Sequence, residues 1–226
     1  MQPFRTLTAT AAPLLRDHID TDAIIPSREI RSVSKHGLSV GLFAGWRYRA
    51  TGGPPTGGRE PDPDFVLNQA RFAGAQILLA GGNFGCGSSR EHAVWALADQ
   101  GFRAIIAPSF APIFHDNCVN NGVLALCLPR ATVAALADAL LTALSEPRLT
   151  IDLERQELHP HDLLTQGRVG TESAVGGAGV IPFTVDADVR LRLLEGLDAI
   201  DLSLRRLTGL DAFHQRDRED RPWVYL

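Results

Sequence analysis

Short apolar runs alternate with amphipathic stretches through the middle of the 226-residue chain. An apolar run of roughly four to eight residues between turn residues is typical of a buried strand, and apolar residues every three to four positions are typical of a helix with one buried face. These patterns indicate an α/β domain. The predicted strands are 76–80, 102–108, 123–128, 149–153 and 180–185, and the predicted helices are 88–100, 113–121, 131–144 and 186–206.

The predicted helix at 88–100 carries a start signal and a stop signal. Ser88 and Glu91 have the S-x-x-E spacing of a capping box, in which two side chains satisfy backbone N–H groups at a helix start. Gly101 is placed to end the helix. Residues 76–108 therefore form a predicted strand–loop–helix–strand unit, which implies that its two strands are parallel.

Two segments are too rich in glycine and proline to hold a helix or strand, so we predict loops near 52–63 and 167–179. The last predicted helix has Gly196 as its candidate break point. We expect residues 1–226 to form a single domain that closes with a C-terminal helix and tail over 186–226.

Composition and charge exclude several classes of partner. Lys and Arg number 22 against 26 Asp and Glu, a net charge of −4, so there is no basic surplus for binding nucleic acid. No apolar stretch reaches the roughly 20 residues that a membrane span needs, and no signal peptide is evident.

The cysteines, Cys86, Cys118 and Cys127, have no paired spacing, which argues against a disulfide framework, a zinc site or an iron–sulfur cluster held by this chain. We expect a cytoplasmic protein with reduced thiols.

The most informative segment, 81–92, places four glycines between a predicted strand and a predicted helix. Glycines let the backbone approach a ligand, and a helix start favours an anion. The dinucleotide fingerprint fails because Arg90 stands where its last glycine belongs, and the P-loop fingerprint fails because Ser88 replaces its lysine. An anion site with hydroxyls and a guanidinium remains. The alternative is that Ser88 only caps the helix and Arg90 only faces water.

A second polar cluster spans 17–26, where three carboxylates precede an apolar turn. It lacks the glycine and the ligand spacing of an EF-hand. Three basic residues follow it, Arg28, Arg31 and Lys35, and they have the charge to bind a carboxylate substrate. The alternatives are a solvated acidic turn and an exposed charged loop.

Several motifs along the chain occur together in one known family. They are Asp20-Thr-Asp22 with Ile24-Ile-Pro26, Gly41 to Trp46, Asp64 to Asn68, Asn83 to Leu97, Ile105 to Phe110, Asn120-Asn-Gly122 and Leu194 to Leu204. Through them the chain resembles the small subunits of 3-isopropylmalate dehydratase, in the aconitase superfamily, over nearly its whole length. The resemblance implies a swivelling β/β/α domain, with a mixed sheet and flanking helices. It also implies a large-subunit partner that carries a [4Fe–4S] cluster, with no metal or cofactor in this chain.

The resemblance assigns roles to five residues. Ser88 matches an alkoxide base that removes a proton from the carbon next to a carboxylate. Ser89 and Arg90 match substrate-binding positions, Asp22 matches an active-site aspartate, and Arg31 matches a position that helps to set substrate choice. A serine is a poor base unless its anion is stabilised, which the helix start and the nearby guanidinium favour.

Glu29 departs from the family pattern, because relatives place an aromatic or large apolar residue there. A negative charge near a dicarboxylate pocket would repel the substrate unless it were turned outward or paired.

The expected function is that of a hydro-lyase subunit in leucine biosynthesis. With its large subunit it would convert 2-isopropylmalate, a small dicarboxylate, to 3-isopropylmalate through isopropylmaleate. One alternative is a related hydro-lyase acting on citraconate or dimethylmaleate. A second is a non-catalytic anion- or nucleotide-binding module, which the two failed phosphate fingerprints disfavour.

Overall fold

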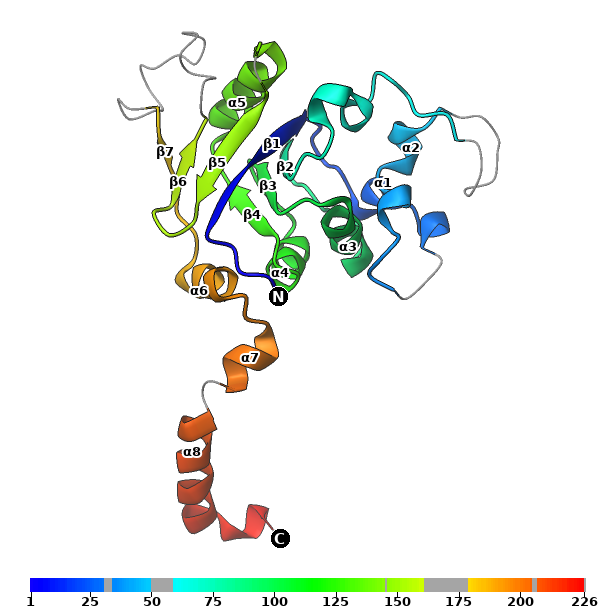
Figure 1. Cartoon of the computed structure of the whole chain (residues 1–226). Helices are drawn as coiled ribbons and strands as arrows, with labels where there is room; N and C mark the ends of the chain where they lie inside the picture. The colour runs from blue at the N-terminus through cyan, green and yellow to red at the C-terminus, as the bar shows by residue number, and fades with distance from the viewer. Residues whose placement is uncertain (31–33, 50–58, 145, 161–178, 205–206, 226) are drawn as a thin grey trace.

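A seven-stranded mixed sheet, in the order β4-β3-β2-β1-β5-β6-β7, forms the centre of the molecule (Figure 1). The structure is a computed structural model that describes residues 1–226 apart from 31–33, 50–58, 145, 161–178, 205–206 and 226. The strands are β1 (Thr6–Leu14), β2 (Ile77–Ala80), β3 (Ala104–Ala107), β4 (Leu124–Cys127), β5 (Arg148–Asp152), β6 (Glu157–His159) and β7 (Ile181–Pro182).

One half of the sheet is parallel and the other half is antiparallel. β1 pairs with β2, β2 with β3 and β3 with β4 in parallel, which confirms the parallel strands predicted for 76–108. On the other side of β1, the pairs β1–β5, β5–β6 and β6–β7 are antiparallel. β1 is therefore the strand at which the sheet changes direction, although the sequence patterns did not predict it.

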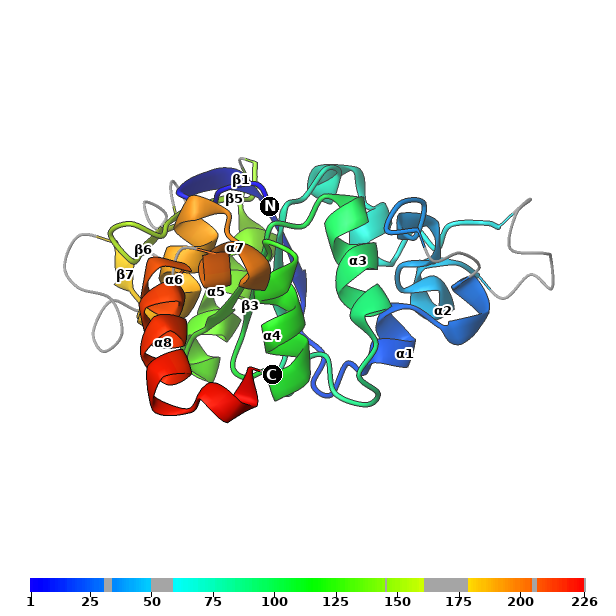
Figure 2. The same ribbon diagram turned by 90° about the horizontal axis from the view of Figure 1, so that it is seen from below.

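Helices cover both faces of the sheet. Viewed from below, α1, α2 and α3 lie on one side of the strands and α5 and α6 lie on the other (Figure 2). The helices are α1 (Thr21–Ile24), α2 (Ala44–Arg47), α3 (Glu91–Gln100), α4 (Pro112–Asn120), α5 (Arg130–Thr142), α6 (Ala187–Glu195), α7 (Ala199–Leu204) and α8 (Leu207–Asp220). Short 3-10 turns are η1 (Ser27–Glu29), η2 (Ser39–Gly41), η3 (Val66–Asn68), η4 (Ala70–Phe72) and η6 (Pro222–Val224).

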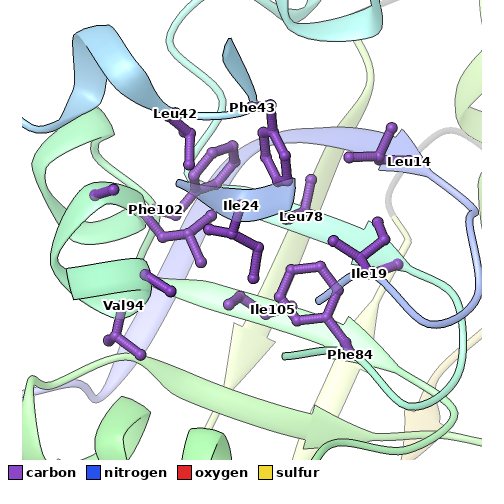
Figure 3. Packing of buried hydrophobic residues seen from close by; sticks show 14 of the residues in the cluster. Leu14, Ile19, Ile24, Leu42, Phe43, Leu78, Phe84, Val94, Phe102 and Ile105 are labelled. Atoms are coloured by element: carbon purple, nitrogen blue, oxygen red, sulfur yellow. The ribbon is translucent and has the colours of Figure 1, made fainter. Parts of the chain in front are cut away.

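Each face of the sheet supports its own apolar core. All four residues of β2 are buried, and because successive side chains point to opposite faces, Leu78 and Ala80 join one core while Ile77 and Leu79 join the other. In the first core, Ile24 of α1 is surrounded by side chains of α3, β2, β3 and the 42–43 segment (Figure 3). This core anchors α1, which leads directly into the polar segment that follows it.

The C-terminal region differs from the single helix and tail expected over 186–226. α6 ends at Gly196, which adopts a left-handed conformation with φ of +69° and confirms the expected break. Two further helices follow, and α8 occupies residues that were expected to be a tail. These helices extend away from the sheet and its helices (Figure 1). Most of both predicted glycine-rich loops, 52–63 and 167–179, lies outside the described residues.

The loop after β2 comes very close to α4 at Gly85. This glycine has φ of +76°, and a Cβ added to it would lie 2.1 Å from Cγ of buried Phe114. Gly37 has a similar φ of +82°, but a Cβ there would meet nothing within 4 Å. The two positions therefore separate the effect of crowding from the effect of backbone conformation.

We expect Gly85→Ala to lower the free energy of unfolding by about 2–5 kcal/mol, because it adds overpacking to the strain of a left-handed alanine. Gly37→Ala should lower it by only about 1–2 kcal/mol, the strain alone. Urea unfolding of both variants measures the difference. Equal losses would show that the contact with Phe114 relaxes at no cost.

Candidate active site

The loops that follow β1, β2 and β3 meet at one edge of the sheet. Parallel strands bring their carboxyl ends to the same edge, which is where open α/β sheets bind ligands. Two isolated parallel bridges continue the sheet beyond its strands, one between Asp20 and Cys86 and the other between Phe84 and Phe110. The two polar clusters found in the sequence are thus neighbours in the structure.

Backbone hydrogen bonds join segment 16–21 to segment 81–86 along most of their length. The N–H of His18 donates to the carbonyl of Gly82 (2.9 Å), that of Gly85 to Ile19 (2.8 Å) and that of Thr21 to Cys86 (2.9 Å). A Cβ on Gly81 would lie 2.3 Å from the carbonyl oxygen of Arg16. The glycine-rich composition is therefore required here for backbone to pack on backbone.

Asp17 ties the outer end of this contact to α5. Its Oδ1 accepts from the N–H of Gly82 at 2.7 Å, and both of its oxygens accept from Nη1 of Arg130, at 3.0 and 3.1 Å. The Arg130 guanidinium is the main reason that the pKa of Asp17 lies below its ordinary value. Asp17 thus links the loop after β1 to the loop after β2 and to the start of α5.

Ser88, Ser89 and Arg90 lie at the inner end, beside a hollow of about 210 Å³. Both serines are exposed, and Arg90 is half-buried. The first turn of α4 forms the opposite wall through Pro112 and Ile113. Pro112 has no N–H, but the N–H groups of Ile113 and Phe114 in this first turn have no partner within the helix, so this wall favours an anion.

Ser88 does not cap α3, so the predicted capping box is wrong. α3 begins at Glu91, with Arg90 in the N-cap position and no side-chain cap. The Glu91 carboxylate instead accepts from Nδ2 of Asn121 at 2.9 Å. The N–H of Arg90 donates to the carbonyl of Ser88 (2.7 Å), so the chain turns once before the helix starts and the Ser88 hydroxyl stays at the surface of the hollow.

Thr21 is a site residue that the sequence analysis missed. Its side chain is buried, its hydroxyl donates to the carbonyl oxygen of Ser88 (3.0 Å), and its Oγ1 lies 3.2 Å from Oγ of Ser88. The available signal was its position between Asp20 and Asp22 in the acidic motif. Thr21 is the side chain best placed to exchange a hydrogen bond with the Ser88 hydroxyl.

Asp22 contacts Arg90, the residue two positions after Ser88. Its Oδ1 accepts from Nη1 of Arg90 (2.5 Å) and from the N–H and hydroxyl of Ser27 (3.3 and 3.4 Å). The hydrogen bond from Arg90 is the largest reason that the pKa of Asp22 is lowered. Asp20, by contrast, caps α1 by accepting from the N–H of Ala23 at 2.6 Å. Arg31 lies outside the described residues.

Within the part of the chain that the structure describes, no three His, Cys, Asp or Glu side chains gather as metal ligands. The three cysteines are free thiols: Cys86 is half-buried, Cys118 is buried and Cys127 is exposed. Burial raises the pKa of the Cys118 thiol well above its ordinary value. Over the same described residues, no helix is long and apolar enough to cross a membrane.

We expect the pKa of Asp22 to lie below its ordinary value of 3.8 and to rise toward it in Arg90→Met, which removes the main hydrogen bond. Because folding lowers this pKa, the ionised carboxylate stabilises the folded state above pH ~4, and that contribution is lost as the pH falls through the lower folded pKa. Carboxyl NMR titration measures both values. Ser27→Ala, which removes a weaker contact, should raise the pKa less, and an unchanged pKa in Arg90→Met would refute the assignment.

Comparison with known proteins agrees with this geometry. Residues 1–131 match the family model described as the aconitase C-terminal domain. A 3-isopropylmalate dehydratase small subunit from Cupriavidus necator is 52% identical, with 100% of this chain and 99% of the relative aligned. Another, from Methylibium petroleiphilum, is 46% identical over 99% of this chain and 97% of its own.

A solved structure supports the fold alone. The 3-isopropylmalate dehydratase structure from Methanocaldococcus jannaschii aligns with a TM-score of 0.58 and 24% identity, covering 92% of this chain and 99% of that one. The expected mixed sheet with flanking helices is confirmed, as is the resemblance found in the motifs. The chain therefore belongs to the 3-isopropylmalate dehydratase small-subunit family, in the aconitase superfamily.

Proposed function

We propose that this chain is the small subunit of a hydro-lyase that interconverts 2-isopropylmalate and 3-isopropylmalate through isopropylmaleate in leucine biosynthesis, together with a large subunit. The observation that carries the proposal is the gathering of Ser88, Ser89, Arg90 and Asp22 at one sheet edge in a member of this family. The names of the relatives favour neither another dicarboxylate hydro-lyase nor a non-catalytic anion-binding module.

The work is divided between the two subunits in this proposal. A [4Fe–4S] cluster would be held by the large subunit and would supply Lewis-acid chemistry at the substrate hydroxyl. The residues described here do not fit such a cluster, because the only three cysteines are scattered and Cys118 is buried. Free thiols also agree with a reducing compartment, so we place the protein in the cytoplasm.

Ser88 is proposed as the base. Its alkoxide removes the proton from the carbon next to a carboxylate, and the electron pair of that C–H bond forms the double bond as the hydroxyl leaves the neighbouring carbon. The Thr21 hydroxyl, which donates to the Ser88 carbonyl in this structure, can rotate to donate to the alkoxide 3.2 Å away. A donor placed in advance at a developing anion is a strong source of stabilisation. In the rehydration step the Ser88 hydroxyl returns the proton to the other carbon.

Arg90 is proposed to bind a substrate carboxylate. A guanidinium has five N–H donors, so Asp22 at Nη1 leaves others for a second carboxylate in the paired geometry that arginine favours. The exposed Ser89 hydroxyl lines the same hollow. In this arrangement Asp22 orients Arg90 and need not touch the substrate.

The function is tested by purifying this chain with its large subunit and following isopropylmaleate by the ultraviolet absorbance of its conjugated double bond. We expect activity on 2-isopropylmalate to exceed activity on the substrates of citraconate and dimethylmaleate hydro-lyases, and the chain alone to be inactive. Preference for one of those other substrates would refute the assigned substrate. Activity or stoichiometric iron in the chain alone would refute the division between subunits.

Ser88→Ala should lower kcat of the assembled enzyme by roughly 10³-fold, because the base is lost. Its free energy of unfolding should change by less than about 1 kcal/mol, since Ser88 is exposed and caps no helix. Ser89→Ala serves as the matched neighbour and should act mainly on KM. Near-normal turnover in Ser88→Ala would place the base elsewhere.

Arg31 is proposed as a second carboxylate contact. Arg31→Ala should lower kcat/KM by about ten- to a hundred-fold, because a charge-assisted hydrogen bond is lost. Arg31→Lys should lower it less, since lysine keeps the charge but not the fork. Arg49→Ala, whose side chain is 49% exposed and pairs with the exposed Glu60, is the control and should change little. Unchanged kinetics in Arg31→Ala would remove this residue from the site.

A further inference from the structure

Glu29 is an acidic residue with a side chain that is only 5% exposed. It ends η1, and its side chain lies against Gly41, where an added Cβ would be 2.6 Å from the Glu29 Cβ. The lack of a side chain at Gly41 therefore makes room for Glu29. A carboxylate buried in this way needs hydrogen-bonding partners of its own.

Arg59 supplies that partner from a distant part of the chain. Its Nη2 donates to both carboxylate oxygens of Glu29, at 2.8 and 2.9 Å, and its side chain is 16% exposed. The guanidinium carbon also lies 5.1 Å from the centre of the Tyr48 ring. The negative charge of Glu29 is therefore paired with the positive charge of Arg59. A paired carboxylate meets the condition set in the sequence analysis, so Glu29 does not act as an unpaired charge that repels a dicarboxylate substrate.

Arg59 directly precedes one of two chain segments that are hydrogen-bonded to each other. Two backbone hydrogen bonds of 2.9 Å join segment 47–49 to segment 60–62. The Tyr48 hydroxyl donates to the carbonyl of Val40 at 3.2 Å, one residue before Gly41. The ion pair thus connects η1 to segments 47–49 and 60–62.

A continuous set of contacts leads from this ion pair to the site. η1 begins at Ser27, whose N–H and hydroxyl donate to Asp22, and Asp22 accepts from Arg90. The N–H of Glu29 donates to the carbonyl of Pro26 (2.8 Å), which holds the turn between them.

We propose that Glu29 and Arg59 are positioning residues for the substrate-carboxylate contacts. Their ion pair fixes η1, so that Ser27 stays against Asp22 and Asp22 against Arg90. Neither residue touches the substrate, and neither supplies a proton. This inference rests on the proposed function, since it assumes that Arg90 binds a substrate carboxylate.

The test compares Glu29→Gln, Arg59→Gln and the double variant in the enzyme assembled with its large subunit. Each single variant should raise KM for 2-isopropylmalate about ten-fold or more, because small displacements of binding groups have large effects, while kcat stays within about two-fold. The double variant should be no worse than the worse single variant, because the two residues act as a unit. Arg59→Lys, which keeps the charge, should recover part of the loss.

The exposed ion pair between Arg49 and Glu60, in the same two hydrogen-bonded segments, provides the control. Its side chains are 49% and 57% exposed, so Arg49→Ala should leave KM unchanged. Hydrogen–deuterium exchange of amides 27–30 gives a readout that needs no activity: it should be faster in Glu29→Gln and unchanged in Arg49→Ala.

Three results would overturn the inference: a KM within about two-fold of normal in folded variants, additive effects in the double variant, or unchanged exchange at 27–30. If the assembled enzyme is inactive on 2-isopropylmalate, the proposed function fails, and exchange at 27–30 still decides whether the ion pair orders η1. Should Glu29→Gln not fold, the KM of Arg59→Gln carries the test, and a normal value there would overturn the inference as well.

Discussion

Direct backbone contact between the loops after β1 and β2 determines where every polar side chain of the site lies. The hydrogen bonds between segments 16–21 and 81–86 run from main chain to main chain, so their register does not depend on which side chains the loops carry. Glycine is needed at Gly81, where a Cβ would overlap the carbonyl of Arg16 in the other loop, and at Gly85, where it would overlap the Phe114 ring of α4. Thr21 and Ser88 meet because this register leaves them opposite one another.

The same contact explains why the site was only partly predictable. Four glycines between a strand and a helix indicated a close approach of backbone and an anion site, and the structure places Ser88, Ser89 and Arg90 around a hollow there. The prediction of a capping box failed because that motif involves only residues within one helical turn. The partner that Ser88 finds, Thr21, is 67 positions away, and no local pattern contains it.

The secondary structure was also only partly predictable from the sequence. Strands with both faces buried, such as β2 and β3, stand out as apolar runs and were predicted. β1 alternates threonine with small apolar residues and is exposed over its first part, so it does not stand out from a polar loop. α8 was missed for a similar reason: its sequence is mostly polar and its few apolar side chains, Leu210 and Phe213 among them, are exposed, so it shows no long apolar face.

The central place of β1 has a consequence for how the chain folds. Its pairing with β5 joins Thr8 to Thr150, 142 positions apart, whereas β2, β3 and β4 are all present by residue 127. During synthesis the parallel half of the sheet is therefore complete while β1 still has an open edge, and such edges invite pairing with other chains. Contacts this distant in sequence form slowly. The segment matched by the aconitase C-terminal model stops at residue 131, so by itself it would keep that edge exposed.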